Sequence, residues 1–154
     1  MANPDFAGRE YPATEPYSVG REKIREFADA VGASHPAHHD LVAARGLGYP
    51  DLVAPPTFAV VVAQRAEQQY VADPEAGIDF SRVVHADETF TYDRPIVAGD
   101  EIAAVLHVDS VTQRAGISMV TTRCELFAAD ADEGAPGEHV ATVTSSLVVR
   151  GEDS

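Results

Sequence analysis

The sequence is poor in cysteine, tryptophan and basic residues, and each shortage excludes a class of protein. Its 154 residues include one cysteine, no tryptophan, and 11 basic against 25 acidic side chains. A single cysteine excludes an intrachain disulfide and a cysteine-rich zinc site. The net charge of −14 argues against nucleic acid or an anionic membrane as the main partner, because phosphates would be repelled.

Long apolar runs are missing as well. The longest one covers residues 58–63, far short of the roughly 20 residues that span a bilayer. The first residues lack a basic region followed by an apolar run, so we expect no signal peptide and a cytoplasmic protein. Apolar residues nevertheless make up 45% of the chain, which is enough to bury the core of one domain.

The chain divides into a short arm, one domain and a short tail. Residues 1–16 are rich in Pro, Glu and Ala, and we expect a flexible N-terminal arm there. The domain covers residues 17–150, and the tail covers residues 151–154. An amphipathic helix opens the domain after Gly20, because apolar residues recur there with helical spacing, at Ile24, Phe27, Ala28 and Val31.

A second helix is predicted over residues 57–71. Its first half, from Phe58 to Ala63, is apolar almost all round, and its second half consists of good helix formers. Pro56 suits a first helical turn. A helix that is apolar on most sides must be surrounded by other elements, so we expect it to be central.

From Arg82 onward, apolar residues follow the period of a strand. Val84, Ala86, Phe90 and Tyr92 fall on one face, with His85 on the other, although Glu88 interrupts the apolar face. Three further strands follow, with a hairpin turn at residues 114–116. The predicted class is α+β, with one curved antiparallel sheet wrapped around the central helix.

Three segments resemble the MaoC-like (R)-specific hydratases and dehydratases, which have the hot-dog fold. Residues 27–40 read FADAVGASHPAHHD and resemble the active-site segment of that family. Residues 49–58 read YPDLVAPPTF and resemble the entry into its central helix. Residues 85–100, which end in YDRPIVAGD, resemble its first long strand and the turn after it. The nearest resemblance is to the accessory subunits of actinobacterial (3R)-hydroxyacyl-acyl-carrier-protein dehydratases.

The resemblance implies a dehydratase site with one half of its catalytic pair missing. Dehydration of a 3-hydroxyacyl thioester removes a proton from C2 and protonates the leaving hydroxyl, which suits a carboxylate beside an imidazole. His38 falls on the catalytic histidine of the family, but Ala33 falls on the catalytic aspartate. Asp29 and Asp40 are the nearest carboxylates in sequence.

We therefore expect an acyl-thioester-binding subunit that forms a heterodimer with a catalytic hot-dog subunit. Two alternatives stay open: a self-sufficient homodimeric hydratase that uses His38, and a binding module without activity. The substrate would be carried on acyl-carrier protein or coenzyme A, and no cofactor is implied. An unpaired sheet edge also favours an oligomer on physical grounds.

The expected substrate-binding residues are His35, which falls on the family's asparagine, and Pro56, Thr57 and Phe58 at the start of the central helix. The valines after Phe58 would be core residues or would line an acyl tunnel. A metal site is not expected, because the histidines of residues 35–39 lie in a proline-containing loop with no regular ligand spacing.

Overall fold

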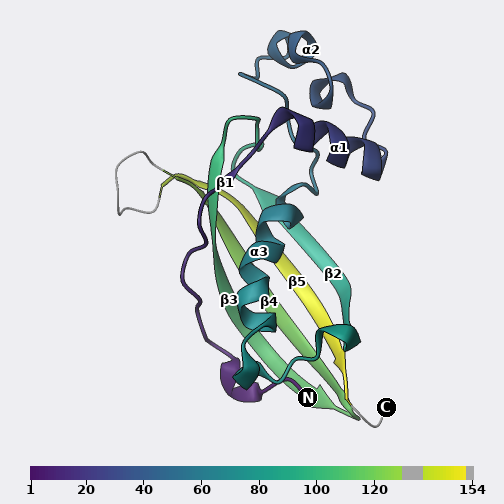
Figure 1. The fold of residues 1–154 in the computed structure, drawn as a ribbon, viewed down its shortest axis with the longest axis vertical. Coiled ribbons are helices and arrows are strands. Elements are labelled where there is room, and N and C mark those ends of the chain that lie inside the picture. The colour runs from purple at the N-terminus through teal and green to yellow at the C-terminus, as the bar shows by residue number, and fades with distance from the viewer. Residues whose placement is uncertain (130–136, 152–154) are drawn as a thin grey trace.

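A long curved sheet lies against one central helix, and two shorter helices gather at one end (Figure 1). The computed structural model describes residues 1–129 and 137–151. The helices are α1 (Arg21–Val31), α2 (Leu41–Gly46) and the central α3 (Ala59–Val71). The strands are β1 (Tyr17–Ser18), β2 (Val83–Tyr92), β3 (Glu101–Arg114), β4 (Ile117–Ala128) and β5 (His139–Arg150). The predicted α+β hot-dog fold is confirmed.

The five strands form one antiparallel sheet in the order β1-β3-β4-β5-β2. Strands β3 and β4 are joined at Ala115 and Gly116, both of which have positive φ angles, 50° and 77°. Such a turn matches the twist of the strands that it connects. The hairpin predicted at residues 114–116 is therefore present.

Helix α3 packs on the concave face of the sheet through one stripe of small and apolar side chains. The stripe recurs every three or four residues and comprises Ala59, Val62, Ala63, Ala66 and Tyr70. Alanines let the helix come close to the strands. The thiol of Cys124 on β4 lies 3.6 Å from the carbonyl oxygen of Ala63. The predicted central helix is confirmed, and it begins two residues later than expected.

Strand β2 departs from the simple alternation that its sequence predicts. The pairing of β2 with β5 shifts between His85 and Asp87, which marks a β-bulge. Val84 lies exposed, whereas Glu88 is partly buried and shares the alternation of Phe90 and Tyr92. The prediction of one apolar face from residue 84 to residue 92 was wrong, because a one-residue insertion reverses the faces.

The N-terminal residues, expected to be a flexible arm, instead lie along β3. Backbone amides of Gly8 and Tyr11 donate to carbonyls of β3 at 2.7 and 2.9 Å. Phe6 in the short helix η1 (Pro4–Phe6) is buried and lies 5.8 Å from the Tyr70 ring. Buried apolar side chains such as Phe6, together with the backbone hydrogen bonds to β3, hold this mostly polar segment in place. Of the predicted tail, residues 152–154 lie outside the described residues.

Helix α1 forms as predicted, with Ile24 and Ala28 buried. It ends at Gly32, whose φ of 71° suits glycine. Val31, expected on the apolar face, lies exposed. Among the described residues, no helix has the length and apolar character needed to cross a bilayer.

Candidate functional site

The segment between α1 and α3 is bound at its C-terminal part to the connection between β2 and β3. After α1, the chain forms the short helix η2 (Pro36–His38) and then α2, whose first turn is capped by Asp40. The amide of Val53 donates to Ala37 at 3.0 Å, and the amide of Ala54 donates to Ile96 at 2.8 Å. These bonds place the histidines of η2 beside the turn that follows β2.

His38 is oriented by a backbone hydrogen bond. Its Nδ1 lies 2.6 Å from the carbonyl oxygen of Val53. A carbonyl only accepts, so Nδ1 carries the proton and Nε2 of the neutral ring keeps a free lone pair. His35 has the opposite arrangement, because its Nδ1 accepts from the Ala37 amide at 3.1 Å. The two rings lie 5.9 Å apart.

Both imidazoles line a cavity of about 660 Å³. Its other polar groups come from Tyr49, Tyr92, Asp93 and Arg94. The remaining wall is apolar and consists of Ala37, Leu47, Val53, Ala54, Pro56, Pro95 and Ile96. Cavities of this size and lining hold small organic ligands.

The structure brings His35, His38 and Pro56 together and separates Phe58 from them. Phe58 is fully buried and packs edge-on against Phe27, with ring centroids 5.4 Å apart. Thr57 is exposed and does not line the cavity. The hydroxyl of Tyr92 donates to the carbonyl of Pro56 at the start of α3. Burial raises the pKa of Tyr92 to about 12, so that donor stays protonated.

Neither carboxylate near His38 in sequence pairs with its ring. Asp40 is occupied as the cap of α2, accepting from the amide of Ala43 at 2.9 Å. Asp29 lies 3.9 Å from His39, and the Nε2 of His39 is 2.8 Å from the carbonyl oxygen of Ala33. Within residues 29–40, the His38 ring therefore has no carboxylate partner.

Sequence reasoning missed Asp93 and Arg94 as residues of this cavity. Both lie in the segment 85–100 that carries the resemblance, but nothing in their spacing indicates a site. Arg94 donates to both carboxylate oxygens of Asp100, at 2.9 and 3.1 Å, and its Nε lies 3.1 Å from Glu138. The bonds to Asp100 raise the pKa of Arg94, and its charge is balanced by these two carboxylates.

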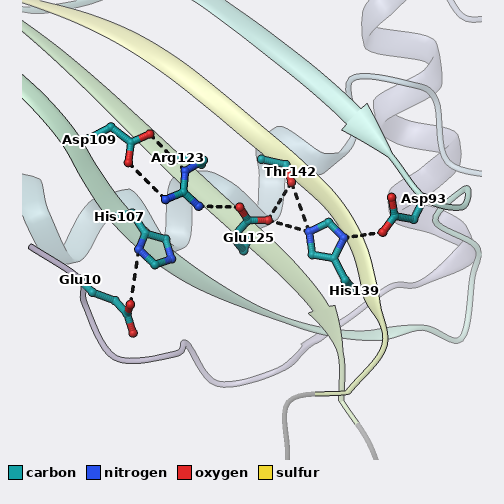
Figure 2. Close-up of polar contacts among 8 residues, drawn as sticks. All are labelled: Glu10, Asp93, His107, Asp109, Arg123, Glu125, His139 and Thr142. Carbon is teal, nitrogen blue, oxygen red and sulfur yellow. Dashed lines mark hydrogen bonds and ion pairs between the residues drawn. The ribbon is translucent and has the colours of Figure 1, made fainter. Parts of the chain in front are cut away.

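Asp93 is held by a polar network on the outer face of the sheet (Figure 2). Its carboxylate lies 2.6 Å from Nδ1 of His139, and Nε2 of His139 lies 2.6 Å from Glu125. Arg123 bridges Glu125 to Asp109 at 2.6 and 3.1 Å. Within residues 1–129 and 137–151, no three His, Cys, Asp or Glu side chains are grouped to hold a metal ion.

The sequence profile described as the FAS1-like dehydratase domain region matches residues 5–143 of this chain. A UPF0336 protein of Leifsonia xyli subsp. xyli is 55% identical over 98% of this chain and 97% of its own length. A UPF0336 protein of Saccharopolyspora erythraea is 49% identical over 95% of this chain and 90% of its own length.

Among solved structures, a chain of the C-terminally truncated HadBC (3R-hydroxyacyl-ACP dehydratase) complex of Mycobacterium tuberculosis is 35% identical. It covers 94% of this chain and 97% of its own length, with a TM-score of 0.80. The R-hydratase PhaJ1 of Pseudomonas aeruginosa is 17% identical and has a TM-score of 0.68 over 95% of this chain and 83% of its own. At that identity, PhaJ1 shows the shared fold alone.

Proposed function

This chain belongs to the FAS1-like dehydratase family, and we propose that it is the acyl-thioester-binding subunit of a (3R)-3-hydroxyacyl thioester dehydratase of fatty-acid-type metabolism. The observation that carries the proposal is the cavity of about 660 Å³ at His38, in a chain with Ala33 at the family's aspartate position. The cavity provides a place for an acyl group, while the catalytic pair is incomplete. A partner subunit would supply the missing carboxylate.

The residues of the cavity suit particular parts of a thioester. The apolar wall formed by Val53, Ala54 and Ile96 would bury an acyl chain. The free Nε2 of His38 can accept a hydrogen bond from the 3-hydroxyl group and hold the substrate in register for the partner's carboxylate. In this role His38 is a binding group, and proton removal from C2 takes place on the partner.

The likeness to HadBC supports a two-subunit enzyme, because that protein is by name a complex and a dehydratase. The sheet offers a place for a second subunit. The arm at residues 8–14 lies along β3, whereas the outer edge of β2 has no backbone partner among the described residues. An unpaired edge strand is a ready surface for pairing with another chain.

The proposal is tested by a hydration assay on crotonyl and longer enoyl thioesters of coenzyme A and acyl-carrier protein. We expect no turnover from this chain alone. We expect a stable complex with the other subunit of HadBC, used as the probe partner, and a higher rate than that subunit gives alone. Turnover by this chain alone that is lost in His38→Ala would overturn the proposal. Binding of thioesters without any complex or rate gain would indicate a binding module.

A second candidate function is a self-sufficient hydratase, and Asp93 is the observation that favours it. Asp93 lines the same cavity as His38, although its carboxylate bonds to His139. If Asp93 served as the missing acid-base group, Asp93→Asn would abolish turnover by the isolated chain. An isolated chain without activity to lose excludes this candidate.

Acyl binding in the cavity predicts a chain-length effect. Leu47 on the cavity wall is largely exposed, so Leu47→Trp can project a ring into the cavity without disturbing the core. We expect this variant of the complex to lose activity on long enoyl thioesters and to keep it on crotonyl thioesters. Val42→Trp is the matched control, because Val42 lies on α2, which Leu47 directly follows, is exposed, and does not line the cavity.

A further inference from the structure

The cavity at His38 has two charged residues on its wall, and each is neutralised from behind that wall. Among the described residues, Asp93 and Arg94 are the only Asp, Glu, Lys or Arg side chains that line it. Arg94 bonds to two carboxylates outside the cavity, and Asp93 bonds to His139, which does not line it either. A ligand therefore meets charges that other residues already balance.

Arg94 has little hydrogen-bonding capacity left for a ligand. A guanidinium carries five N–H donors. Two of these are directed to the carboxylate of Asp100, one to Glu138 and one to the carbonyl of Pro95, at 2.9 to 3.1 Å. A ligand carboxylate would find a single donor there, rather than the two parallel donors that bind such groups best.

Asp93 is balanced by an imidazolium on the outer face of the sheet (Figure 2). Nδ1 of His139 lies 2.6 Å from Asp93, and its Nε2 lies 2.6 Å from Glu125. An ionised carboxylate only accepts hydrogen bonds, so both ring nitrogens carry protons. Glu125 also bonds to Arg123 at 2.6 Å and accepts from the hydroxyl of Thr142 at 2.7 Å. His139 therefore supplies the positive charge opposite Asp93.

Most of the remaining wall is apolar. Val53, Ala54 and Ile96 face the cavity with aliphatic groups, and the hydroxyl of Tyr92 already donates to the carbonyl of Pro56. Moving a charged group from water into such surroundings is costly unless an opposite charge is free to pair with it. An alkyl or hydroxyalkyl chain carries no such cost.

We propose that His139 determines the selectivity of this cavity for uncharged acyl groups. By balancing Asp93 from the outer face, it removes the attraction that this carboxylate would exert on a cationic chain and reduces its repulsion of an anionic one. Arg94, held by its own carboxylates, offers an anionic chain little in return. The inference rests on the proposed function for the binding of acyl thioesters, and it adds the class of acyl group and the residue that selects it.

The experiment measures the Kd of the full chain at pH 6 for three thioesters of pantetheine: hexanoyl, adipoyl and 6-aminohexanoyl. Pantetheine has no phosphate, so the ligands differ in charge only at the end of the acyl group. We expect the wild type to bind the hexanoyl thioester at least about tenfold more tightly than either charged ligand. In His139→Gln, binding should be unchanged for hexanoyl, about threefold weaker for adipoyl and about threefold tighter for 6-aminohexanoyl.

His107→Gln is the matched control. His107 also lies on the outer face and pairs with a carboxylate, that of Glu10 at 3.4 Å, but Glu10 does not line the cavity. This variant should leave all three Kd values unchanged. In an Asp93→Asn background, His139→Gln should no longer alter the affinity for either charged ligand, because it acts through Asp93. Opposite changes for the two charges cannot come from a general loosening of the fold.

The same measurements at pH 9 test the charge on His139. The charged groups that face its ring are Asp93 and Glu125, with Arg123 beyond Glu125. The other imidazoles of the cavity are the same in both proteins, so the comparison between the wild type and His139→Gln isolates this one ring. The two proteins should differ less at pH 9, where His139 has lost its proton.

The outcomes separate this inference from the proposed function. Equal affinities of the wild type for the three ligands, or equal changes for all three in His139→Gln, overturn the inference even if the complex with the HadBC subunit shows a rate gain. The expected preference without a complex or a rate gain counts against the proposed function alone. A chain that binds none of the ligands overturns both, because the cavity then accepts no acyl group.

Discussion

His139 lies between two carboxylates on the outer face of the sheet, and its charge contributes to stability. Hydrogen bonds to Asp93 and then to Glu125 raise its pKa, while partial burial acts in the opposite direction. The same contacts join the end of β2 to β4 and β5 (Figure 2). One imidazolium therefore connects segments that are far apart in the sequence.

The raised pKa of His139 predicts a pH-dependent loss of stability in His139→Gln. The contribution is fully present below the ordinary histidine pKa of about 6.5 and is lost as the pH rises through the higher folded value. Urea unfolding should therefore show a difference of about 0.5–1 kcal/mol near pH 6 that shrinks toward pH 9. In a Glu125→Gln background, His139→Gln should lower the free energy of unfolding by a smaller amount. A loss of stability that does not change with pH would contradict the raised pKa of His139.

At the scale of the element, the N-terminal arm acts as a cover for the edge of β3. Phe6 is 1% exposed, and the guanidinium of Arg9 lies 3.7 Å from its ring centroid. Composition alone indicated a loose segment, because its polar residues outnumber these anchors. The contacts with β3 depend on a strand about a hundred residues away, which local reasoning does not see.

Truncation of the arm's anchor should destabilise the whole domain. Phe6→Ala removes a buried ring beside Tyr70, and we expect the free energy of unfolding to fall by about 3–5 kcal/mol. Urea denaturation followed by circular dichroism measures this loss. Val42→Ala, at an exposed position of α2, should change it by less than about 0.5 kcal/mol. An equal effect of the two substitutions would mean that the arm does not contribute to the fold.

Two glycines in the segment around the cavity should respond oppositely to alanine. Gly32 ends α1 with a φ of 71°, so Gly32→Ala should cost about 1 kcal/mol. Gly46 is the last residue of α2, without a positive φ and with open space around it, so Gly46→Ala should be neutral or stabilising by a few tenths of a kcal/mol. Thermal unfolding of the two variants checks whether each melting temperature falls or rises. An equal change in the two melting temperatures would contradict the role of the positive φ at Gly32.

At the scale of the whole molecule, the order of elements could be predicted because it rests on periodicity. The helical spacing around Ile24 and the two-residue alternation of the later strands are local signals. The residues that line the cavity could not be predicted in this way. Asp93 and His38 line one cavity only because the segment after β2 lies beside η2. The bulge after His85 shows in the sequence only through Glu88, which interrupts the apolar alternation without indicating where the extra residue lies.

Cys124 provides a reporter for cooperative unfolding of the whole molecule. It lies buried between β4 and α3, and burial strongly raises the pKa of its thiol. We expect a thiol reagent at pH 8 to label it only at the rate of global unfolding, and rapidly in urea. Phe6→Ala should speed this labelling in proportion to its loss of stability. Fast labelling of the native wild type would show a local opening of the sheet instead.

The covered edge of β3 also limits how large an assembly can grow by extension of the sheet. Open-ended growth by strand addition needs two unpaired sheet edges on every subunit. Here the N-terminal segment already covers one of them. When one subunit pairs with β2, the second edge of the sheet is covered as well. Stacking by this route therefore terminates at a pair rather than continuing into a filament.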